Sequence, residues 1–273
     1  MAGYRLGIIG CGHMGEAILK GVLDNSFLSP GQVIFYEKDV SRGEHIVNEY
    51  KISPAKNIEE LVKLSGYILI AVKPQDLKDV LDKLKGNFDC GVNSIISIAA
   101  GIPTSYIEEL LDLNVSVVRI MPNAPALFGK GVAAVSSGRF VNKNDLVFSE
   151  NLIKSVGDYV FIDEEFQNIA TALSGSGPAY FFLFCKYLIK AGMDNGLDTE
   201  IARKLVVGTM IGAGIAIEKS GADLDELIKR VASPGGTTEK ALEEFARSKL
   251  GEIIEKAVEK ANKRAHELQK FLD

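Results

Sequence analysis

The fold class is decided near the start of the chain. Residues 4–16 read YRLGIIGCGHMGE, an apolar strand followed by a G-x-G-x-x-G turn and the first turn of a helix. In this setting Gly10 permits the tight turn, Gly12 lets the backbone approach a pyrophosphate, and Gly15 lets the helix pack against the strand. The stretch therefore predicts a dinucleotide-binding βαβ unit.

Residues near this turn are candidates for the same cofactor site. His13 and Met14 open the helix, whose unsatisfied amides attract phosphate, and we expect them to line the loop rather than to take part in chemistry. Glu37 follows the second apolar run, where an acidic side chain typically binds the adenosine ribose and disfavours a 2′-phosphate. Lys38 and Arg42 come soon after it and could instead pair with such a phosphate. The choice between NADH and NADPH therefore stays open.

Two further strand ends complete the predicted cofactor site. Ligands of open parallel sheets bind beyond the carboxyl ends of the strands. We therefore place Val72, Lys73 and Pro74, at the end of one apolar run, over the nicotinamide ribose. Ala99 and Ala100, at the end of the next run, belong to the same region.

Apolar runs alternate with helical patterns through the first half of the chain. The runs are 5–9, 33–36, 67–72, 94–99, 115–121 and 131–135. The first four are rich in Ile and Val without strict alternation, as expected for strands covered on both faces. After Phe161 almost everything reads as helix. We predict an α/β fold with an N-terminal Rossmann-type doubly wound sheet in residues 1–162 and an all-α C-terminal domain in residues 163–273.

Composition and charge exclude several classes of protein. The 273 residues are 47% hydrophobic and carry a net charge of −5, so neither disorder nor nucleic-acid binding is expected. The three cysteines and three histidines are scattered, which argues against disulfides and a metal site. Tyr4–Ile9 reads as a strand rather than a signal segment, and the apolar run 205–217 is too short to cross a membrane. We expect a cytoplasmic protein.

The helical half carries signs of close packing. Pro178 can begin a helix, and Asp198 can cap the next one. Residues 201–217 are apolar nearly all round, so that helix must be buried in a core or against another subunit. Gly208 and Gly212 form a G-x-x-x-G pair that lets another backbone approach. Packing within the chain and a dimer interface both explain the pair.

Three segments outside the cofactor half do not resemble packing sequence. They are 119–125 (RIMPNAP), 172–179 (ALSGSGPA) and 231–239 (VASPGGTTE). In the third, Gly-Gly-Thr-Thr precedes an amphipathic helix and presents amides and hydroxyls at its positive end, which suits a carboxylate. A helix cap with a glycine hinge would explain one threonine but not the doubled glycine and threonine.

Taken together, these motifs resemble those of the pyrroline-5-carboxylate reductase family over essentially the whole chain. The matching stretches are AVKPQ (71–75), SIAAGI (97–102), RIMPNAPAL (119–127), LSGSGPAYFF (173–182) and VASPGGTTEKAL (231–242). The resemblance implies hydride transfer from NADPH or NADH to the C5 imine carbon of 1-pyrroline-5-carboxylate, giving L-proline in the final step of proline biosynthesis. It also implies a helical domain that interlocks with a second subunit, in dimers that can assemble into rings.

The resemblance assigns roles to residues of the helical half. The backbone of Gly236 and Thr237, with Ser233 nearby, would hold the substrate carboxylate. Thr238 would hydrogen-bond the ring nitrogen, either orienting the imine or helping to deliver its proton, and is the catalytic candidate. A protonated imine is already an electrophile, so placement against the cofactor can supply most of the catalysis.

Four more residues receive roles from the same resemblance. Glu164 would contact the substrate, and Ser176 would line its pocket. Asn123 would help to define the nicotinamide end of that pocket, and Asn57 would contact the adenosine side of the cofactor.

Two other functions are compatible with parts of this pattern. A related two-domain hydroxyacid dehydrogenase would place a proton-carrying lysine four residues after Gly177, where this chain has Phe181. A dinucleotide-binding sensor without turnover would be expected to lose Thr238 or the double glycine, and both are intact.

Overall fold

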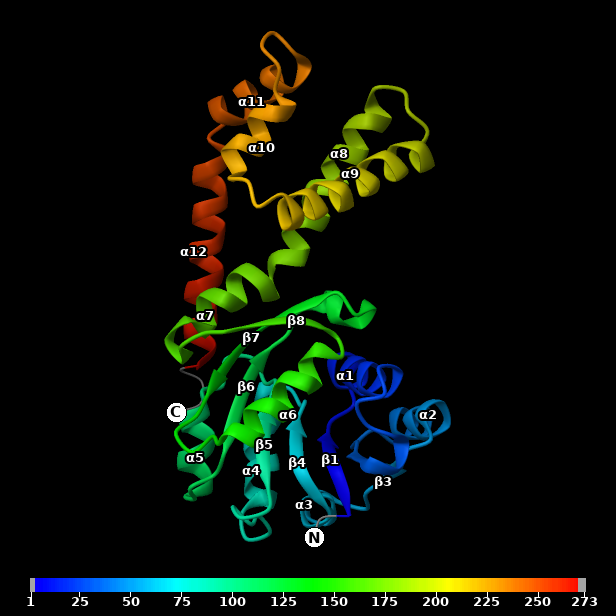
Figure 1. Ribbon diagram of the computed structural model, residues 1–273, viewed down its shortest axis with the longest axis vertical. Helices are drawn as coiled ribbons and strands as arrows, with labels where there is room; N and C mark the ends of the chain where they lie inside the picture. The colour runs from blue at the N-terminus through cyan, green and yellow to red at the C-terminus, as the bar shows by residue number, and fades with distance from the viewer. Residues whose placement is uncertain (1–2, 270–273) are drawn as a thin grey trace. The chain divides into compact units, whose positions relative to one another are not determined.

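The computed structural model describes residues 3–269 (Figure 1). The chain forms two compact units, one containing the residues up to Ser176 and those from Ala261 onward, the other Gly177–Lys260. This division falls later along the chain than the predicted boundary of 162/163. The reason is that residues 164–176 are hydrogen-bonded to strands of the first unit. The side-chain amide of Gln167, for example, donates to the Ser136 hydroxyl over 2.9 Å.

The first unit is built on one eight-stranded sheet of order β3-β2-β1-β4-β5-β6-β7-β8. Its strands are β1 Tyr4–Ile9, β2 Val33–Tyr36, β3 Ser53–Pro54, β4 Ser65–Ile70, β5 Ser94–Ser97, β6 Val117–Met121, β7 Gly131–Ser137 and β8 Gly157–Phe161. Neighbours from β3 to β6 pair in parallel, β7 is antiparallel to β6, and β8 is parallel to β7. The predicted doubly wound α/β class is confirmed, and the sequence prediction missed β3 and β8.

Helices cover both faces of this sheet. They are α1 His13–Asp24, α2 Val40–Tyr50, α3 Ile58–Leu64, α4 Leu77–Leu84, α5 Thr104–Leu111 and α6 Lys143–Lys154. Short turns of 3-10 helix lie at η1 Pro30–Gln32, η2 Pro74–Asp76, η3 Ala124–Phe128 and η4 Glu164–Phe166, followed by α7 Gln167–Ala170 and the π-helical turn η5 Thr171–Gly175. Ile8 belongs to the core that includes α1, α2 and α6, and Ile9 to the core that includes α3, α4 and α5. Burial on both faces explains the unbroken Ile and Val runs.

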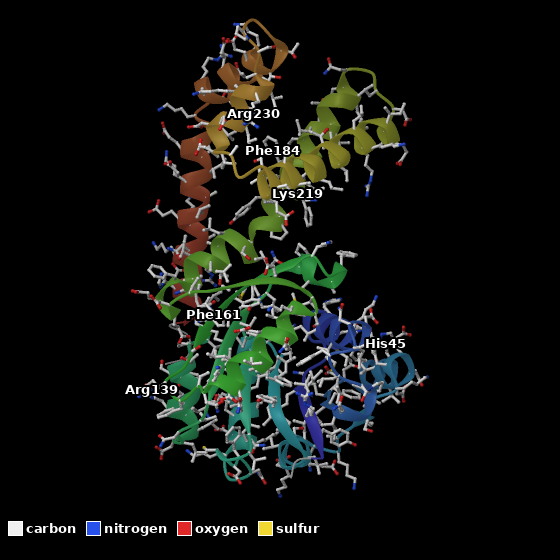
Figure 2. The ribbon with its side chains drawn as sticks, viewed as in Figure 1. His45, Arg139, Phe161, Phe184, Lys219 and Arg230 are labelled. Atoms are coloured by element: carbon white, nitrogen blue, oxygen red, sulfur yellow. The ribbon has the colours of Figure 1, made fainter. Side chains whose placement is uncertain are left out.

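The second unit is helical. Its elements are α8 Gly177–Asp194, α9 Thr199–Ser220, α10 Leu224–Val231, α11 Thr237–Arg247 and α12 Leu250–Gln269, whose last turns belong to the first unit. Gly196 turns the chain between α8 and α9 at φ +92°, and Asp198 caps α9 as predicted, accepting from the Glu200 amide over 2.8 Å. Phe184 of α8 (Figure 2) lies 6.2 Å from the Phe245 ring of α11, centroid to centroid. Among residues 3–269, no helix is long and apolar enough to span a bilayer.

One ion pair ties the end of the first unit to its sheet. Arg119 of β6 is 1% exposed, and its Nη1 lies 3.2 Å from the Glu164 carboxylate at the start of η4. The same carboxylate accepts from both the amide of Thr104, over 2.8 Å, and its hydroxyl, at the start of α5. Burial lowers the pKa of the Arg119 guanidinium, and Glu164 opposes that shift. The pair therefore holds α5, β6 and η4 together.

Replacing Glu164 by Gln should destabilise the first unit, because it leaves the Arg119 charge buried without a counter-charge. We expect the free energy of unfolding to fall by about 3 kcal/mol, as for a buried pair that loses one partner. Urea unfolding followed by circular dichroism measures the loss. Asp82→Asn, in the exposed Lys78–Asp82 pair, is the matched control and should cost less than about 1 kcal/mol. Equal losses in the two variants would contradict the structural role of Glu164.

Candidate functional site

The turn after β1 has a backbone that only glycine fits. Gly10 has φ +89°, and its amide donates to the Tyr36 carbonyl at the end of β2 over 2.9 Å. A Cβ at Gly10 would lie 2.9 Å from Val72 Cγ1, and one at Gly15 would lie 2.5 Å from the Gly10 carbonyl oxygen. The close approach of α1 to the strand ends therefore depends on both glycines.

The N-terminus of α1 is left open for an anion. Gly12 is the cap residue, and within the described part of the chain no side chain caps this helix. Gly12 and His13 are exposed, Met14 is half-buried, and a Cβ added at Gly12 would meet nothing within 4 Å. Orphan amides at a positive helix end next to open space fit the pyrophosphate of a dinucleotide.

The carboxylate of Glu37 is held at this turn. Its Oε2 accepts from the Cys11 amide over 2.7 Å, and its Oε1 from the Asp39 amide over 3.0 Å. Lys38 is paired with Asp76 at 3.0 Å. Burial, with the nearby Glu37 charge, raises the pKa of the Cys11 thiol far above its usual range, so this cysteine stays protonated. In the described residues no group of three His, Cys, Asp or Glu side chains could hold a metal ion.

The remaining cofactor candidates also lie at strand ends. Val72, Lys73 and Pro74 follow β4, and Ala99 and Ala100 follow β5. Backbone hydrogen bonds continue the sheet as far as these positions, from the Ala71 amide to the Ile9 carbonyl over 2.9 Å and from the Ile98 amide to the Ile70 carbonyl over 3.0 Å. The structure thus brings the predicted loop, Glu37 and both strand ends to the same edge of one sheet.

Two predicted contact residues have structural hydrogen bonds that the sequence analysis missed. Asn57 caps α3, accepting from the Glu60 amide over 2.8 Å. The Asn123 side chain is buried, accepts from the Val132 amide over 3.0 Å and donates to the Ser174 carbonyl over 3.3 Å. Asn123 therefore positions the turn that leads to Ser176. The predicted cofactor and substrate contacts of these residues stay predictions.

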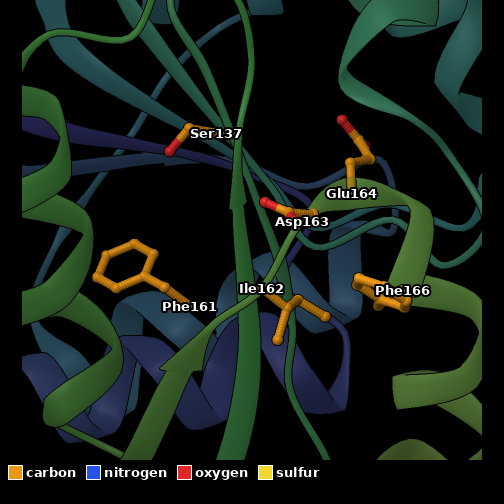
Figure 3. A pocket seen from close by; sticks show the side chains of 6 residues that line it. All are labelled: Ser137, Phe161, Ile162, Asp163, Glu164 and Phe166. Atoms are coloured by element: carbon orange, nitrogen blue, oxygen red, sulfur yellow. The ribbon is translucent and has the colours of Figure 1, made fainter.

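Glu164 lies at the rim of a cavity of about 510 Å³ in the first unit (Figure 3). The other lining residues are Ser137, Phe161, Ile162, Asp163 and Phe166. The carboxylate is already engaged by Thr104 and Arg119. Neither partner was predicted, although a single arginine inside the apolar run SVVRIM is a usable signal. Ser176 is half-buried at the end of this unit, and its amide donates to the Thr171 carbonyl over 2.9 Å.

In the second unit, the segment before α11 forms a compact turn. Gly235 has φ +72°, and its amide donates to the Glu239 carboxylate over 2.8 Å. The Gly236 amide donates to the Ser233 carbonyl over 2.9 Å, and a Cβ at Gly236 would lie 2.6 Å from Ser233 Oγ. The double glycine therefore has a geometric cause, since the first needs a left-handed backbone and the second needs the space of a missing side chain.

This turn leaves the α11 N-terminus open, as the first turn does for α1. Gly236 is the cap residue, no side chain among the described residues caps the helix, and Thr237 and Thr238 are its first two residues. Five other helices are capped by an acidic or amide side chain, from Asp39, Asn57, Asn142, Asp198 and Asp223. The α11 amides and threonine hydroxyls can therefore serve a small anion such as a carboxylate.

Comparison with known families gives two matches. Residues 164–268 match the family model described as pyrroline-5-carboxylate reductase dimerisation. Residues 5–101 match the one described as NADP oxidoreductase, coenzyme F420-dependent. The first begins one residue after the predicted start of the helical domain.

Single relatives match over nearly their whole length. The chain is 32% identical to the pyrroline-5-carboxylate reductase of Corynebacterium melassecola, covering 97% of this chain and 98% of the relative. Among solved structures, a Plasmodium falciparum pyrroline carboxylate reductase with NADP bound superimposes with a TM-score of 0.88 at 30% identity, covering 98% and 99% of the two chains. The Coxiella burnetii reductase reaches 0.90 at 29% identity, over 97% and 98%. Prephenate dehydrogenase of A. aeolicus, 14% identical with a TM-score of 0.55 over 92% and 99%, shares the fold alone. The chain belongs to the pyrroline-5-carboxylate reductase family.

Proposed function

We propose that this chain reduces 1-pyrroline-5-carboxylate to L-proline, the final step of proline biosynthesis, with the residues assigned below. The observation that carries this assignment is the pair of glycine-capped helix N-termini, α1 in one unit and α11 in the other. One suits the pyrophosphate of NADPH or NADH, and the other suits the substrate carboxylate. When bound, the reduced nicotinamide supplies the hydride for the C5 imine carbon.

On the cofactor side, each residue has a role set by its place at the sheet edge. The backbone at Gly10, Gly12, His13, Met14 and Gly15 holds the pyrophosphate, and Glu37 accepts from the adenosine ribose. Val72, Lys73 and Pro74, with Ala99 and Ala100, border the nicotinamide ribose. Asn57 keeps its amide nitrogen for the adenosine side while its oxygen caps α3.

On the substrate side, the α11 turn binds the carboxylate. The Gly236 amide already donates to Ser233, so the Thr237 amide is the main anchor. Gly236 contributes its backbone and lets Ser233 pack beside it, since a Cβ there would lie 2.6 Å from Ser233 Oγ. A charge-assisted hydrogen bond from a helix N-terminus fixes one end of the ring.

Thr238 acts on the ring nitrogen. Thr238 follows Thr237 as the second residue of α11. Adjacent residues therefore hold the carboxylate and the nitrogen of the same small ring. The hydroxyl orients the imine or passes it a proton. Orientation of this kind can supply about 7–11 kcal/mol of a reaction barrier.

Three residues of the first unit also contact or border the substrate in this proposal. Glu164 contacts the substrate with the part of its carboxylate left open by Arg119 and Thr104. Asn123 defines the nicotinamide end through its bonds to Val132 and Ser174. Ser176, which follows that turn, lines the pocket.

Two copies of the chain associate through the helical domain in this proposal. The family model that matches residues 164–268 describes a dimerisation domain. Large apolar side chains of α8 and α9 are exposed in the single chain, among them Phe181 at 63%, Phe182 at 62% and Leu205 at 58%. Apart from its chain neighbours and the nearby backbone of α9 itself, no described atom lies within 4 Å of a Cβ added at Gly208 or Gly212. Both facts favour a subunit interface over packing within the chain. We propose that such dimers can assemble further into rings.

The competing functions gain no support from the site. Phe181, where a hydroxyacid dehydrogenase would carry lysine, is an exposed aromatic residue of α8. The threonine pair and double glycine expected to be lost in a non-catalytic sensor form an open helix start. A cytoplasmic location is part of the same proposal.

The purified protein should oxidise NADH or NADPH only when 1-pyrroline-5-carboxylate is added. The absorbance of the reduced nicotinamide, followed as an initial rate, measures this, and proline appears in equal amount. The six-membered homologue of the substrate tests ring specificity in the same assay. Constant absorbance with both cofactors would end the proposed activity.

Thr238→Ala should lower kcat by roughly 100-fold, within the range for loss of a positioned acid–base group, with little change in the cofactor dissociation constant. Thr238→Ser, which keeps the hydroxyl, should recover most of the turnover. Thr199→Ala, at the equivalent first turn of α9, is the matched control. A variant that lost cofactor binding yet kept its turnover at saturating cofactor would show that Thr238 has been placed wrongly.

A bulky residue in the α9 glycine pair should separate the subunits. Gly212→Leu is expected to shift the mass seen by light scattering from dimer toward monomer. Gly43→Leu, on α2 and equally open in the single chain, controls for adding leucine to a helix. An unchanged mass for Gly212→Leu would place the interface elsewhere.

A further inference from the structure

The first turn of α1 carries a carboxylate with three partners from α2. Glu16 accepts from Arg42 Nη2, from the Tyr50 hydroxyl over 3.0 Å, and lies 2.9 Å from His45 Nε2 (His45 is labelled in Figure 2). Partial burial disfavours the charged form, but the hydrogen bonds from His45, Tyr50 and Arg42 outweigh it, and the pKa of Glu16 is lowered. The carboxylate is therefore charged at neutral pH and fully engaged.

Arg42 is held from two sides. While Nη2 contacts Glu16, its Nε donates to the Cys11 carbonyl over 2.7 Å. The Cys11 amide in turn donates to Glu37 Oε2 over 2.7 Å. Arg42 and Glu37 thus contact the same residue of the glycine turn, next to the position we assign to the adenosine ribose.

The other cation of this segment is also paired. Lys38 lies 3.0 Å from the Asp76 carboxylate. An incoming 2′-phosphate would meet the Glu37 carboxylate and would have to draw Arg42 away from two charge-assisted hydrogen bonds. A ribose with free hydroxyls has no such cost, because it can donate to Glu37 directly.

We propose that Glu16 is a specificity-determining residue: by holding Arg42 it withholds the guanidinium from a 2′-phosphate, and the chain binds NADH in preference to NADPH. This inference rests on the proposed cofactor site. It extends that proposal, since Glu37 alone leaves the choice open while Arg42 stands five residues away. His45 and Tyr50 also contact the Glu16 carboxylate, but the preference depends on the Arg42–Glu16 pair.

Dissociation constants for NADH and NADPH, measured by calorimetric titration without substrate, test the proposal directly. The wild type should bind NADH more tightly. Glu16→Gln keeps the shape of the side chain and removes its charge, which should raise the affinity for NADPH relative to NADH by roughly tenfold, the worth of one charge-assisted hydrogen bond. Adding Arg42→Gln to that variant should cancel the gain. Tyr50→Phe, which leaves the Arg42–Glu16 pair intact, is the matched control and should keep the wild-type ratio.

A second measurement does not depend on how Glu16→Gln folds. Arg42→Gln alone should leave the NADPH-to-NADH affinity ratio within about twofold of wild type, because a guanidinium committed to Glu16 gives the phosphate no charge-assisted hydrogen bond to lose. A large selective loss of NADPH binding would show that Arg42 already binds the phosphate, and would overturn the proposal. A wild-type preference for NADPH, or an unchanged ratio in folded Glu16→Gln, would overturn it too.

Failure of the proposed function has a different signature. If neither dinucleotide binds the wild type, the cofactor site and this inference fall together. If the affinity ratio changes as expected while 1-pyrroline-5-carboxylate is not reduced, the specificity role of Glu16 is supported and only the proposed activity fails.

Discussion

The dinucleotide end of the molecule depends on the two backbone hydrogen bonds of Cys11. Its amide donates to Glu37 and its carbonyl accepts from Arg42, each over 2.7 Å. With the Gly10 amide bound to Tyr36, the turn after β1 is fixed to the end of β2 and to α2 rather than left as a free loop. The amides that we propose face the phosphates, the carboxylate that we propose faces the ribose and the nearest arginine are therefore one connected unit. A change at any of them alters the geometry of the others.

In the proposed function, two helix N-termini of the same kind bind two anions of different size. In both units an amphipathic helix begins at a glycine, Gly12 or Gly236, whereas five other described helices begin at a capping Asp or Asn. A capping side chain would occupy the amides that a ligand needs. The neighbouring side chains differ. The Glu37 carboxylate lies beside the turn before α1, whereas Thr237 and Thr238 follow the turn before α11. The residues that flank each open helix end are the basis for proposing a ribose-bearing dinucleotide at one and a small carboxylate at the other.

Local patterns made much of this predictable. The G-x-G-x-x-G turn, the Asp198 cap and the apolar runs buried on both faces each depend on neighbouring residues alone, and each was predicted from sequence. The strand β8 was missed because its sequence GDYVF has its apolar residues partly exposed. The partners of Glu164 and Arg42 were missed for a different reason. Each of these ion pairs joins residues 26 or more positions apart. The periodicity within one helix or strand does not indicate which other element packs beside it.

Burial decides what the two arginine–carboxylate pairs do. Arg119 is buried almost completely, so its charge has no alternative to Glu164, and the pair acts on stability. The Arg42 side chain is 28% exposed, so an incoming ligand can reach the guanidinium that Glu16 holds. At such a position Glu16 and a ligand phosphate compete for the same guanidinium, so the pair affects binding more than folding stability. The same chemical pair therefore holds a segment to the sheet in one place and selects between two cofactors in the other.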